Sequence, residues 1–364
     1  MTRRSLFRTA AAAGGMAFLP RGAFAGGARA SGFWYPEETD PHERTFMQWP
    51  VNPAVYDDPD FLFDLQGTIA DIANTIAEFE PLVMLAAAEH HKAIRKRVSG
   101  QVELWDTPTD DLWCRDSGPS FVVDGKGGLA VTEFNFNGWG GKQVHGNDGG
   151  IAARVAERLG LQVFDVGLVG EAGGVETDGL GTLIAHESTF INPNRNKGSK
   201  AEVEAKLLET MGAEKVIWAP GIREADITDY HIDALARFVK PGQVLIQMGE
   251  EVDPDDPWSV AAFETHDILA SATDTEGRAL ELVVIPEPWD IRVDSPDFVS
   301  SYVNYYVCNG AVIAAEFGDE AADAEAAAIL ARLYPGREIV MLNVDAVGEV
   351  GGGIHCATHE QPKV

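Results

Sequence analysis

The chain has 364 residues, of which 45% are hydrophobic and 23% are charged, a composition that excludes an intrinsically disordered protein. Its formal net charge of −29 repels nucleic acid and anionic membrane and attracts small cations, although such a charge also serves solubility alone. The three cysteines are odd in number and widely spaced, which argues against a disulfide framework and leaves at least one thiol free.

Residues 1–25 have the features of an export signal. They contain paired arginines, a weakly apolar Ala/Gly-rich run and a small-residue cleavage site, and acids are absent from them. The arginine pair is similar to that of twin-arginine signals, whose cargo is exported already folded, so we expect a periplasmic or secreted protein. Residues 26–32 read as a linker and residues 33–364 as a single catalytic domain. No later stretch has 18 uninterrupted apolar residues, so we expect no membrane span.

Beyond the linker, the apolar pattern predicts alternating strands and helices. Apolar residues at helical spacing predict a helix over 61–79, and turn residues predict hairpins over 122–134 and 302–314. Further helices are expected over 90–98, 149–159, 200–211, 256–272 and 321–333, with a short helix or turn over 233–236. Strands are expected at the end of 41–50 and over 82–88, 102–105, 162–166, 183–191, 216–219, 238–239, 244–248, 280–285 and 339–343.

Strand, helix and strand units thus recur without a long linker, which predicts one α/β domain built from similar modules. The side chains that could do chemistry follow predicted strands, in turns marked by Gly or Pro, where α/β folds place reactive groups. They are Asp116, Glu171, His231, Asp233, Asn304 and Cys356.

Cys356 follows three glycines, Gly351 to Gly353, which let the backbone pass close to another group. Such a turn presents a thiol in a pocket, and it equally suits a small buried cysteine. His231 and Asp233 alternate with Ile232, so their side chains point the same way on an extended backbone.

A thiol, a histidine and several carboxylates permit two chemistries. One is metal-dependent hydrolysis with His231, Asp233, Cys356 and His359 as ligands. The other is covalent catalysis at a cationic carbon. The number of acids favours the second, because carboxylates accept forked hydrogen bonds from a planar guanidinium. Desolvating two acids without a cation costs several kcal/mol, so the acids indicate a positively charged guest.

Seven motifs in chain order resemble those of agmatine deiminases and the related bacterial peptidylarginine deiminases. They are Pro41-His42-Glu43-Arg44-Thr45, Trp113-x-Arg115-Asp116-x-Gly118-Pro119, Phe136-Asn137-x-Trp139-Gly140-Gly141-Lys142, Asp178-Gly179-x-Gly181-Thr182, Asn192-Pro193-Asn194-Arg195-Asn196, Thr228-Asp229-x-His231-Ile232-Asp233 and Gly352-Gly353-Ile354-His355-Cys356. The likeness runs from about Phe33 to Pro362, nearly the whole chain beyond the signal.

The resemblance implies the pentein fold, a five-bladed α/β propeller with the active site on its central axis. It implies Cys356 as nucleophile, His231 as general acid and base, and Glu171 as the acid that supports this histidine. Asp116 and Asp233 would clamp the guanidinium. Trp113, Trp139, Asp229 and Asn304 would bind the substrate. The resemblance implies no cofactor and no metal.

The expected reaction is hydrolytic deimination through a covalent S-alkylthiouronium, with agmatine converted to N-carbamoylputrescine and ammonia. The alternatives are arginine in peptides as substrate, or a guanidine-binding protein without catalysis. The expected partner is a small cationic guanidino compound, and a homo-oligomer stays open. Tyr230 and Ala172 stand where the family has glycines, and we expect the bulk of Tyr230 to narrow or reshape the pocket entrance.

Overall fold

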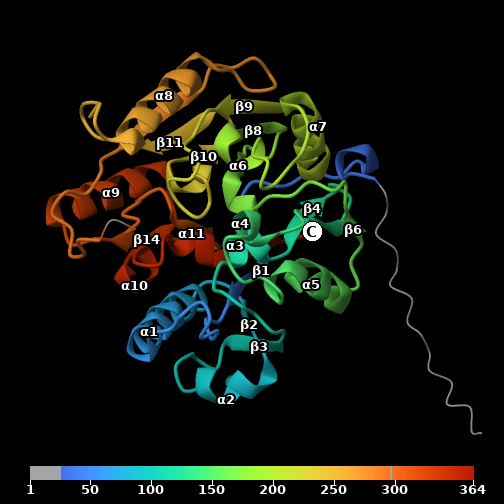
Figure 1. The fold of residues 1–364 in the computed structure, drawn as a ribbon, viewed down its shortest axis with the longest axis vertical. Coiled ribbons are helices and arrows are strands. Elements are labelled where there is room, and N and C mark those ends of the chain that lie inside the picture. Colours follow the sequence, from blue (N-terminus) through green and yellow to red (C-terminus); the bar gives the residue numbers. More distant parts are fainter. Residues whose placement is uncertain (1–25, 296) are drawn as a thin grey trace, which may run out of the picture.

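The computed structural model of the protein describes residues 26–295 and 297–364 (Figure 1). The export signal expected over residues 1–25 therefore lies outside the described residues. Within the described ranges, no helix combines the length and the apolar character needed to cross a membrane.

The strands of the described residues form five small sheets, four with three strands and one with four. The three-stranded sheets are β4 (Ser120–Val123), β5 (Leu129–Thr132) and β6 (Val163–Phe164); β7 (Val175–Thr177), β8 (Thr182–His186) and β9 (Lys215–Ala219); β10 (Ala236–Lys240), β11 (Gln243–Gln247) and β12 (Glu281–Ile285); and β13 (Tyr306–Cys308), β14 (Ala311–Glu316) and β15 (Glu338–Asn343). The four-stranded sheet has the strand order β16 (Thr358–Pro362), β1 (His42–Gln48), β2 (Leu82–Ala86) and β3 (Val102–Asp106).

All five sheets follow one plan. Two strands pair antiparallel, and the second of them pairs parallel with a third strand. A parallel neighbour requires a crossover connection, and a helix lies in each one. These helices are α1 (Pro59–Ile76), α5 (Ile151–Leu159), α7 (Lys200–Met211), α8 (Pro257–Ser271) and α9 (Glu320–Leu333). The strand, helix and strand units predicted from the sequence thus recur in every sheet.

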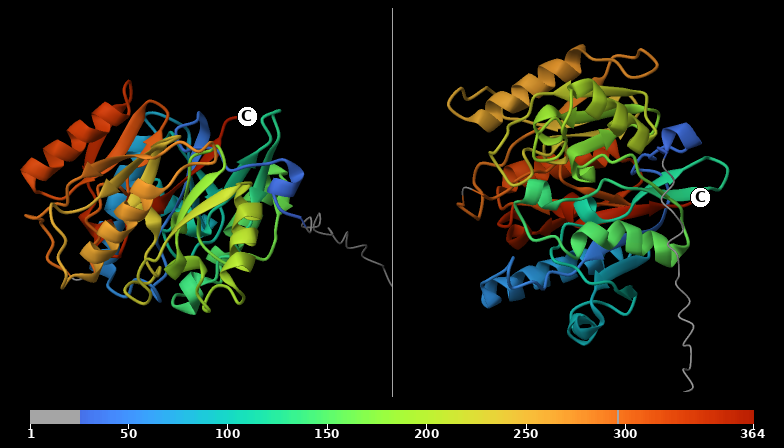
Figure 2. Two further views of the ribbon diagram at one scale, coloured as in Figure 1. Left: turned by 90° about the horizontal axis from the view of Figure 1, so that it is seen from above. Right: turned by 45° about the vertical axis from the view of Figure 1, so that its right-hand side comes forward.

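The crossover helices lie on the outside of the molecule, and three short helices lie near its middle (Figures 1 and 2). The short helices are α3 (Cys114–Ser117), α4 (Gly138–Gly141) and α11 (Ile354–Ala357). Local signals set the outer helices: Asp58 caps α1 ahead of Pro59, and Ser199 forms a capping box with Glu202 at the start of α7. The middle of the molecule is therefore left to turns, which are the segments that carry the polar motifs.

Strand β16 joins the two ends of the described chain. It pairs antiparallel with β1, so that Phe46 lies opposite His359. The sequence of β16 is polar, yet every residue in it is buried. It lacks the apolar alternation that marks a strand, and the sequence analysis did not predict it. The three-residue β7 was also not predicted.

Three expected elements differ from the structure. The helix expected over 90–98 shrinks to η2 (Ala88–His90) and α2 (His91–Ile94), because Ile94 is the only buried side chain of α2. The strand expected over 183–191 ends at His186, and α6 (Glu187–Phe190) follows because Ser188 Oγ donates to the carbonyl of Asp229 at 2.6 Å. The expected turn over 233–236 becomes η5 (Ile232–Ala234) followed directly by β10. The remaining elements are η1 (Arg29–Ser31), η3 (Asp148–Gly150), η4 (Ala172–Gly174) and α10 (Asp345–Gly348).

Candidate active site

Most of the predicted site residues come from turns that precede the first strand of a sheet, whereas Trp139 lies on α4, after β5. α3 precedes β4, η4 precedes β7, η5 precedes β10, and α11 precedes β16. α3 contacts both α11 and η4, and η4 contacts η5. Asn304, just before β13, contributes from the remaining sheet. Each of these turns follows a strand, as expected from the sequence, and each leads into a strand that pairs antiparallel with its neighbour.

A pocket opens where these turns meet. Its lining includes six of the predicted residues, namely Trp113, Asp116, Trp139, His231, Asp233 and Cys356. The lining is completed by Asp226, Ile227, Thr228, Ala234, Val299, Val350, Gly351 and Gly352. Glu171 and Asn304 lie behind this lining, where each contacts a residue of the pocket. The structure thus brings eight of the nine predicted residues together.

His231 lies between two carboxylates. Its Nε2 is 3.3 Å from Glu171 Oε2, and its Nδ1 is 3.7 Å from Asp116 Oδ1. Burial lowers the pKa of His231, but the negative charge of Asp116 and the hydrogen bond with Glu171 outweigh it and raise this pKa to about 9. The unliganded protein therefore holds an imidazolium at neutral pH, which is a proton donor facing the pocket.

Asp116 is fixed by two donors. Trp139 Nε1 donates to its Oδ2 at 2.9 Å, and the backbone N–H of Gly173 donates to its Oδ1 at 3.2 Å. Burial raises the pKa of Asp116 to about 6, against the lowering effect of the His231 charge. A Cβ on Gly173 would come within 3.0 Å of Asp116, His231 and Asp233, so only glycine lets these three side chains converge.

Cys356 is partly exposed to the pocket, whereas Cys114 and Cys308 are buried. Asn304 Nδ2 donates to the Cys356 sulfur at 3.2 Å, and the sulfur is 3.6 Å from Asp233 Oδ2. Burial, and then the charges of Asp233 and Asp116, raise the pKa of the Cys356 thiol well above its usual range. The resting sulfur is therefore a thiol, and a cation in the pocket would favour its thiolate.

The two oxygens of Asp233 have different surroundings. Its Oδ2 is 2.8 Å from His355 Nδ1, and this hydrogen bond outweighs burial and lowers the pKa of Asp233. Its Oδ1 is buried and has no hydrogen-bond partner within residues 26–295 and 297–364. A buried carboxylate oxygen without a donor costs roughly 1–3 kcal/mol, which a ligand with N–H groups removes.

Asp229, predicted to bind substrate, lies outside the pocket lining. Its side chain is fully buried, and its Oδ2 accepts from Arg195 Nη1 at 2.7 Å and lies 2.9 Å from Lys142 Nζ. Arg195 also contacts Glu171 through Nε at 2.9 Å. The structure therefore gives Asp229 a supporting place behind the site, and the pocket carboxylate nearest to it in sequence is Asp226, which the sequence analysis did not select.

Arg195 is a second residue that sequence reasoning missed. Hydrogen bonding from His231 and the charge of Arg195 outweigh burial and lower the pKa of Glu171. Glu171 is thereby kept ionised beside His231. Arg195 belongs to the Asn192–Asn196 motif and could have been selected from it, but the motif does not indicate which residue Arg195 contacts.

The expectation that Tyr230 narrows the pocket entrance is wrong. Its ring packs between His186 and Trp258, with both centroid distances 4.6 Å, and it does not line the pocket. Its φ is +70°, a conformation that glycine adopts without strain, which gives a physical reason for glycine at this position in the family. Ala172 also points away from the pocket and lines a separate cavity.

The four residues considered as metal ligands are not gathered in one place. His359 lies apart, with Nε2 2.9 Å from the Tyr35 hydroxyl and Nδ1 3.1 Å from the carbonyl of Cys114. Among the residues that the structure describes, no cluster of three or more His, Cys, Asp or Glu is arranged to hold a metal ion. The geometry instead combines a thiol, an imidazolium and three carboxylates in one pocket.

Comparisons with known proteins agree on one family. The model of the Porphyromonas-type peptidyl-arginine deiminases matches residues 34–362. Agmatine deiminases of Pseudomonas aeruginosa and Stutzerimonas stutzeri are 35% and 33% identical, with 92% of this chain and 96% of each relative covered. The structure of an agmatine deiminase of Enterococcus faecalis superposes with a TM-score of 0.85 at 27% identity, covering 94% of this chain and 98% of that one. A dimethylarginine dimethylaminohydrolase structure, 13% identical with a TM-score of 0.52, covers 88% of this chain and 99% of its own and shares the fold.

Proposed function

The chain belongs to the Porphyromonas-type peptidyl-arginine deiminase family, and from this premise we propose that it hydrolyses the guanidino group of agmatine to N-carbamoylputrescine and ammonia. The observation that carries the proposal is the convergence of Cys356, His231, Asp116 and Asp233 on one pocket, where a buried oxygen of Asp233 has no donor from the part of the chain that the structure describes. The agmatine deiminases among its relatives support agmatine as the substrate.

The proposed reaction has two halves. Asp116 and Asp233 hold the guanidinium, whose charge favours the Cys356 thiolate. The thiol proton is released to solvent, and the sulfur then adds to the guanidinium carbon. The C–N bond breaks as the His231 imidazolium protonates the departing ammonia, which leaves an S-alkylthiouronium. Neutral His231 then takes a proton from water, the resulting hydroxide attacks the same carbon, and the C–S bond breaks. The ureido product leaves, and the enzyme returns to its starting protonation.

The charges of the pocket favour an amine at the far end of the substrate. The lining contains three carboxylates, those of Asp116, Asp226 and Asp233, and no arginine or lysine of residues 26–295 and 297–364 is part of it. Agmatine ends in an ammonium group, whereas free arginine and a C-terminal arginine carry a carboxylate that the acidic lining repels. Like charges brought together in this way cost several kcal/mol. We therefore assign the outer carboxylate, Asp226, to the amine of agmatine.

A substrate panel tests the proposed function. The wild-type protein is assayed for ammonia release from agmatine, free arginine and a peptide with a C-terminal arginine. We expect kcat/KM for agmatine to exceed that for either carboxylate-bearing substrate by about 100-fold, because each carboxylate meets the acidic lining. Higher kcat/KM for the peptide would reassign the substrate to peptidyl-arginine, and guanidine binding without ammonia release would leave a binding protein.

Asp226→Asn tests the assignment of the amine subsite. The Oδ1 of Asp226 accepts from the backbone N–H of Thr228 at 2.7 Å and of Tyr230 at 3.1 Å, and an amide oxygen can accept both. We expect KM for agmatine to rise about threefold to fivefold, as for a partly exposed ion pair. Methylguanidine is the control, since it has no amine and its KM should stay the same. An equal change for both ligands would show that Asp226 acts on the guanidinium end.

Two further features belong to the same proposal. The five sheets share one strand plan and contribute a turn each to the site, which supports the five-bladed propeller of the pentein fold. We also propose that the protein is exported folded through the twin-arginine-type signal at residues 1–25, which would allow the free thiol of Cys356 to reach the periplasm reduced.

A further inference from the structure

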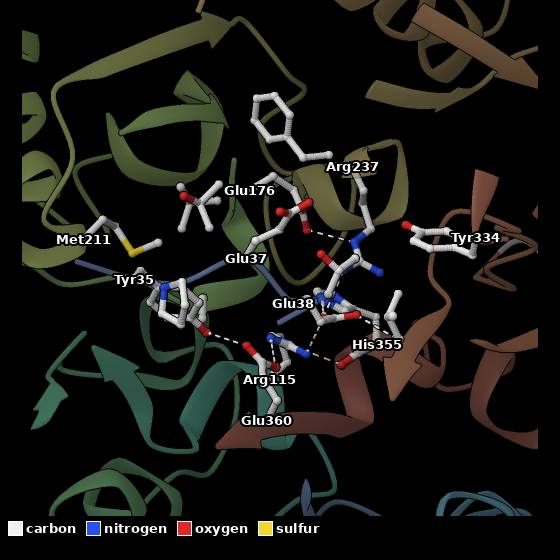
Figure 3. A pocket seen from close by; sticks show the side chains of 17 residues that line it. Tyr35, Glu37, Glu38, Arg115, Glu176, Met211, Arg237, Tyr334, His355 and Glu360 are labelled. Atoms are coloured by element: carbon white, nitrogen blue, oxygen red, sulfur yellow. Dashed lines mark hydrogen bonds and ion pairs between the residues drawn. The ribbon is translucent and has the colours of Figure 1, made fainter. Parts of the chain in front are cut away.

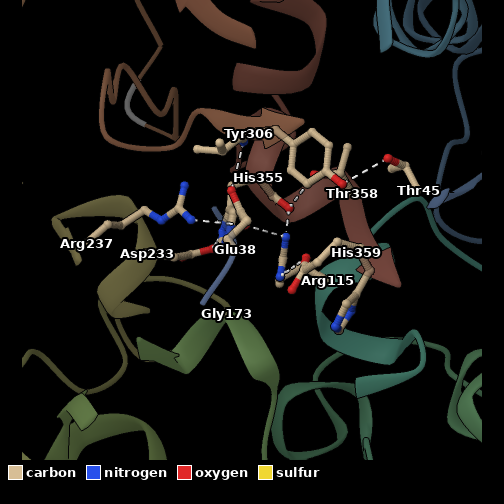
Figure 4. Close-up of polar contacts among 12 residues, drawn as sticks. Glu38, Thr45, Arg115, Gly173, Asp233, Arg237, Tyr306, His355, Thr358 and His359 are labelled. Carbon is tan, nitrogen blue, oxygen red and sulfur yellow. Dashed lines mark hydrogen bonds and ion pairs between the residues drawn. The ribbon is translucent and has the colours of Figure 1, made fainter. Parts of the chain in front are cut away.

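A buried histidine next to the nucleophile links the pocket to the interior of the molecule. His355 precedes Cys356 on α11, but its side chain turns away from the pocket lining and lines a separate cavity (Figure 3). Its Nδ1 is 2.8 Å from Asp233 Oδ2, and its Nε2 is 2.9 Å from Glu38 Oε2 (Figure 4). His355 therefore bridges a pocket carboxylate and an interior carboxylate.

The bridge defines the role of both ring nitrogens. A neutral imidazole has one N–H donor, whereas both nitrogens of His355 face carboxylate oxygens. Arg237 and His355 outweigh burial and lower the pKa of Glu38, and the hydrogen bond from His355 does the same for Asp233. Each ring nitrogen of His355 therefore has its own carboxylate partner, Asp233 at Nδ1 and Glu38 at Nε2.

Glu38 is itself held firmly. Its Oε2 is 3.0 Å from an N–H of Arg115 and 3.0 Å from an N–H of Arg237, and its Oε1 accepts from the backbone of Val307 at 2.8 Å. The two arginines are anchored in turn, Arg115 by Glu360 at 2.8 Å and Arg237 by Glu176 at 2.9 Å. Figure 4 shows Glu38 between the two guanidinium groups. The position of His355 is thus fixed from the side opposite to the pocket.

We propose that His355 is a positioning residue that binds one oxygen of Asp233 and so presents the other oxygen to the substrate guanidinium, with Glu38 holding His355 in place. The inference rests on the proposed function and adds to it a residue that acts through Asp233 without touching the substrate. Among the described residues Asp233 Oδ1 has no donor, whereas Oδ2 is held by His355 and lies 3.6 Å from the Cys356 sulfur, so rotation of the carboxylate would break both contacts.

Two isosteric substitutions separate the two contacts of His355. The amide nitrogen of asparagine takes the place of Nδ1, so His355→Asn keeps a donor toward Asp233. The amide of glutamine reaches the place of Nε2, so His355→Gln keeps the contact with Glu38 and loses the one with Asp233. Both are made in a Cys356→Ala background, which prevents turnover, and the Kd of methylguanidine is measured by calorimetry.

We expect methylguanidine to bind at least fivefold more weakly to His355→Gln than to His355→Asn, as the loss of a charge-assisted hydrogen bond requires. A difference below fivefold, or tighter binding by the glutamine variant, overturns the proposal. Glu38→Gln tests the same contacts without altering His355 and should weaken binding at least threefold; an unchanged Kd overturns the role of Glu38.

His91→Gln is the control, because His91 is a half-buried histidine on α2 whose Nε2 is 3.0 Å from the carbonyl oxygen of Ala86, and it lies outside the pocket lining. Its thermal unfolding reports what the exchange does to folding, and its Kd should equal that of the parent. The wild-type assay keeps the two hypotheses apart. If the wild-type protein releases ammonia but the two His355 variants bind methylguanidine equally, only the positioning role of His355 is contradicted. If the protein binds methylguanidine but the wild type releases no ammonia, only the proposed function is contradicted.

Discussion

Replacing Cys356 with alanine lowers ammonia release from agmatine by a factor of about 10⁴ or more, the loss expected when a covalent nucleophile is removed. The sulfur is the only nucleophile of the covalent mechanism, and neither Asn304 nor Asp233, its two polar neighbours, can replace it. Agmatine should still bind, since both clamp carboxylates remain. The measurement is steady-state ammonia release, with the Kd of agmatine determined on the same variant.

Cys308→Ala is the matched control for this loss. Cys308 is a fully buried thiol on β13, and its substitution removes a sulfur without touching the pocket. We expect Cys308→Ala to keep the wild-type kcat/KM and to unfold at a lower temperature. Cys356→Ala should unfold at nearly the wild-type temperature. More than 1% residual activity in Cys356→Ala would contradict the covalent mechanism.

Much of the fold could be predicted because its outer elements carry local signals. Asp58 with Pro59 and Ser199 with Glu202 mark the starts of α1 and α7, and the turn at Asn309 marks the hairpin of β13 and β14. β16 could not be predicted in the same way. Its polar side chains are satisfied by distant partners, such as Tyr35 for His359 and Arg115 for Glu360, and no local pattern records such contacts.

In the candidate site, too, some residues could be predicted from the sequence and others could not. Cys356, His231 and the two clamp aspartates could be selected because their residue types and motifs indicate their chemistry. Which residues support them depends on contacts across the sheets. Glu38 lies 317 positions from His355 and belongs to none of the motifs, so its place beside the site appears only in the fold.

The distinction between Asp226 and Asp229 was equally hidden from the sequence. Both acids lie close to His231 in one polar cluster, and either could face a substrate. Asp229 has a φ of +62° and is turned toward Arg195, while Asp226 lines the pocket. Backbone conformation, which the residue types do not specify, therefore decides which acid faces the pocket.

The pH dependence of kcat/KM is the second large effect, and its sign follows from three ionisations in the unliganded enzyme. Between about pH 6 and about pH 9, Asp116 is ionised, His231 is an imidazolium, and Cys356 is a thiol whose pKa lies well above its usual range. The transition state for sulfur addition contains the imidazolium and no thiol proton, so it holds one proton fewer than the resting enzyme.

The loss of this proton makes kcat/KM for agmatine rise about tenfold per pH unit, or about 10³-fold from pH 6 to pH 9. Near pH 9 the rise stops, because His231 then loses the proton that the departing ammonia needs. Below pH 6 the profile steepens, because Asp116 takes up a proton and the clamp weakens. Alkylation of Cys356 by iodoacetamide without substrate provides the control and should climb with the same slope. A profile that is flat from pH 6 to pH 9 would mean that the resting enzyme already holds a thiolate beside the imidazolium, and substrate-assisted ionisation of the sulfur would have to be abandoned.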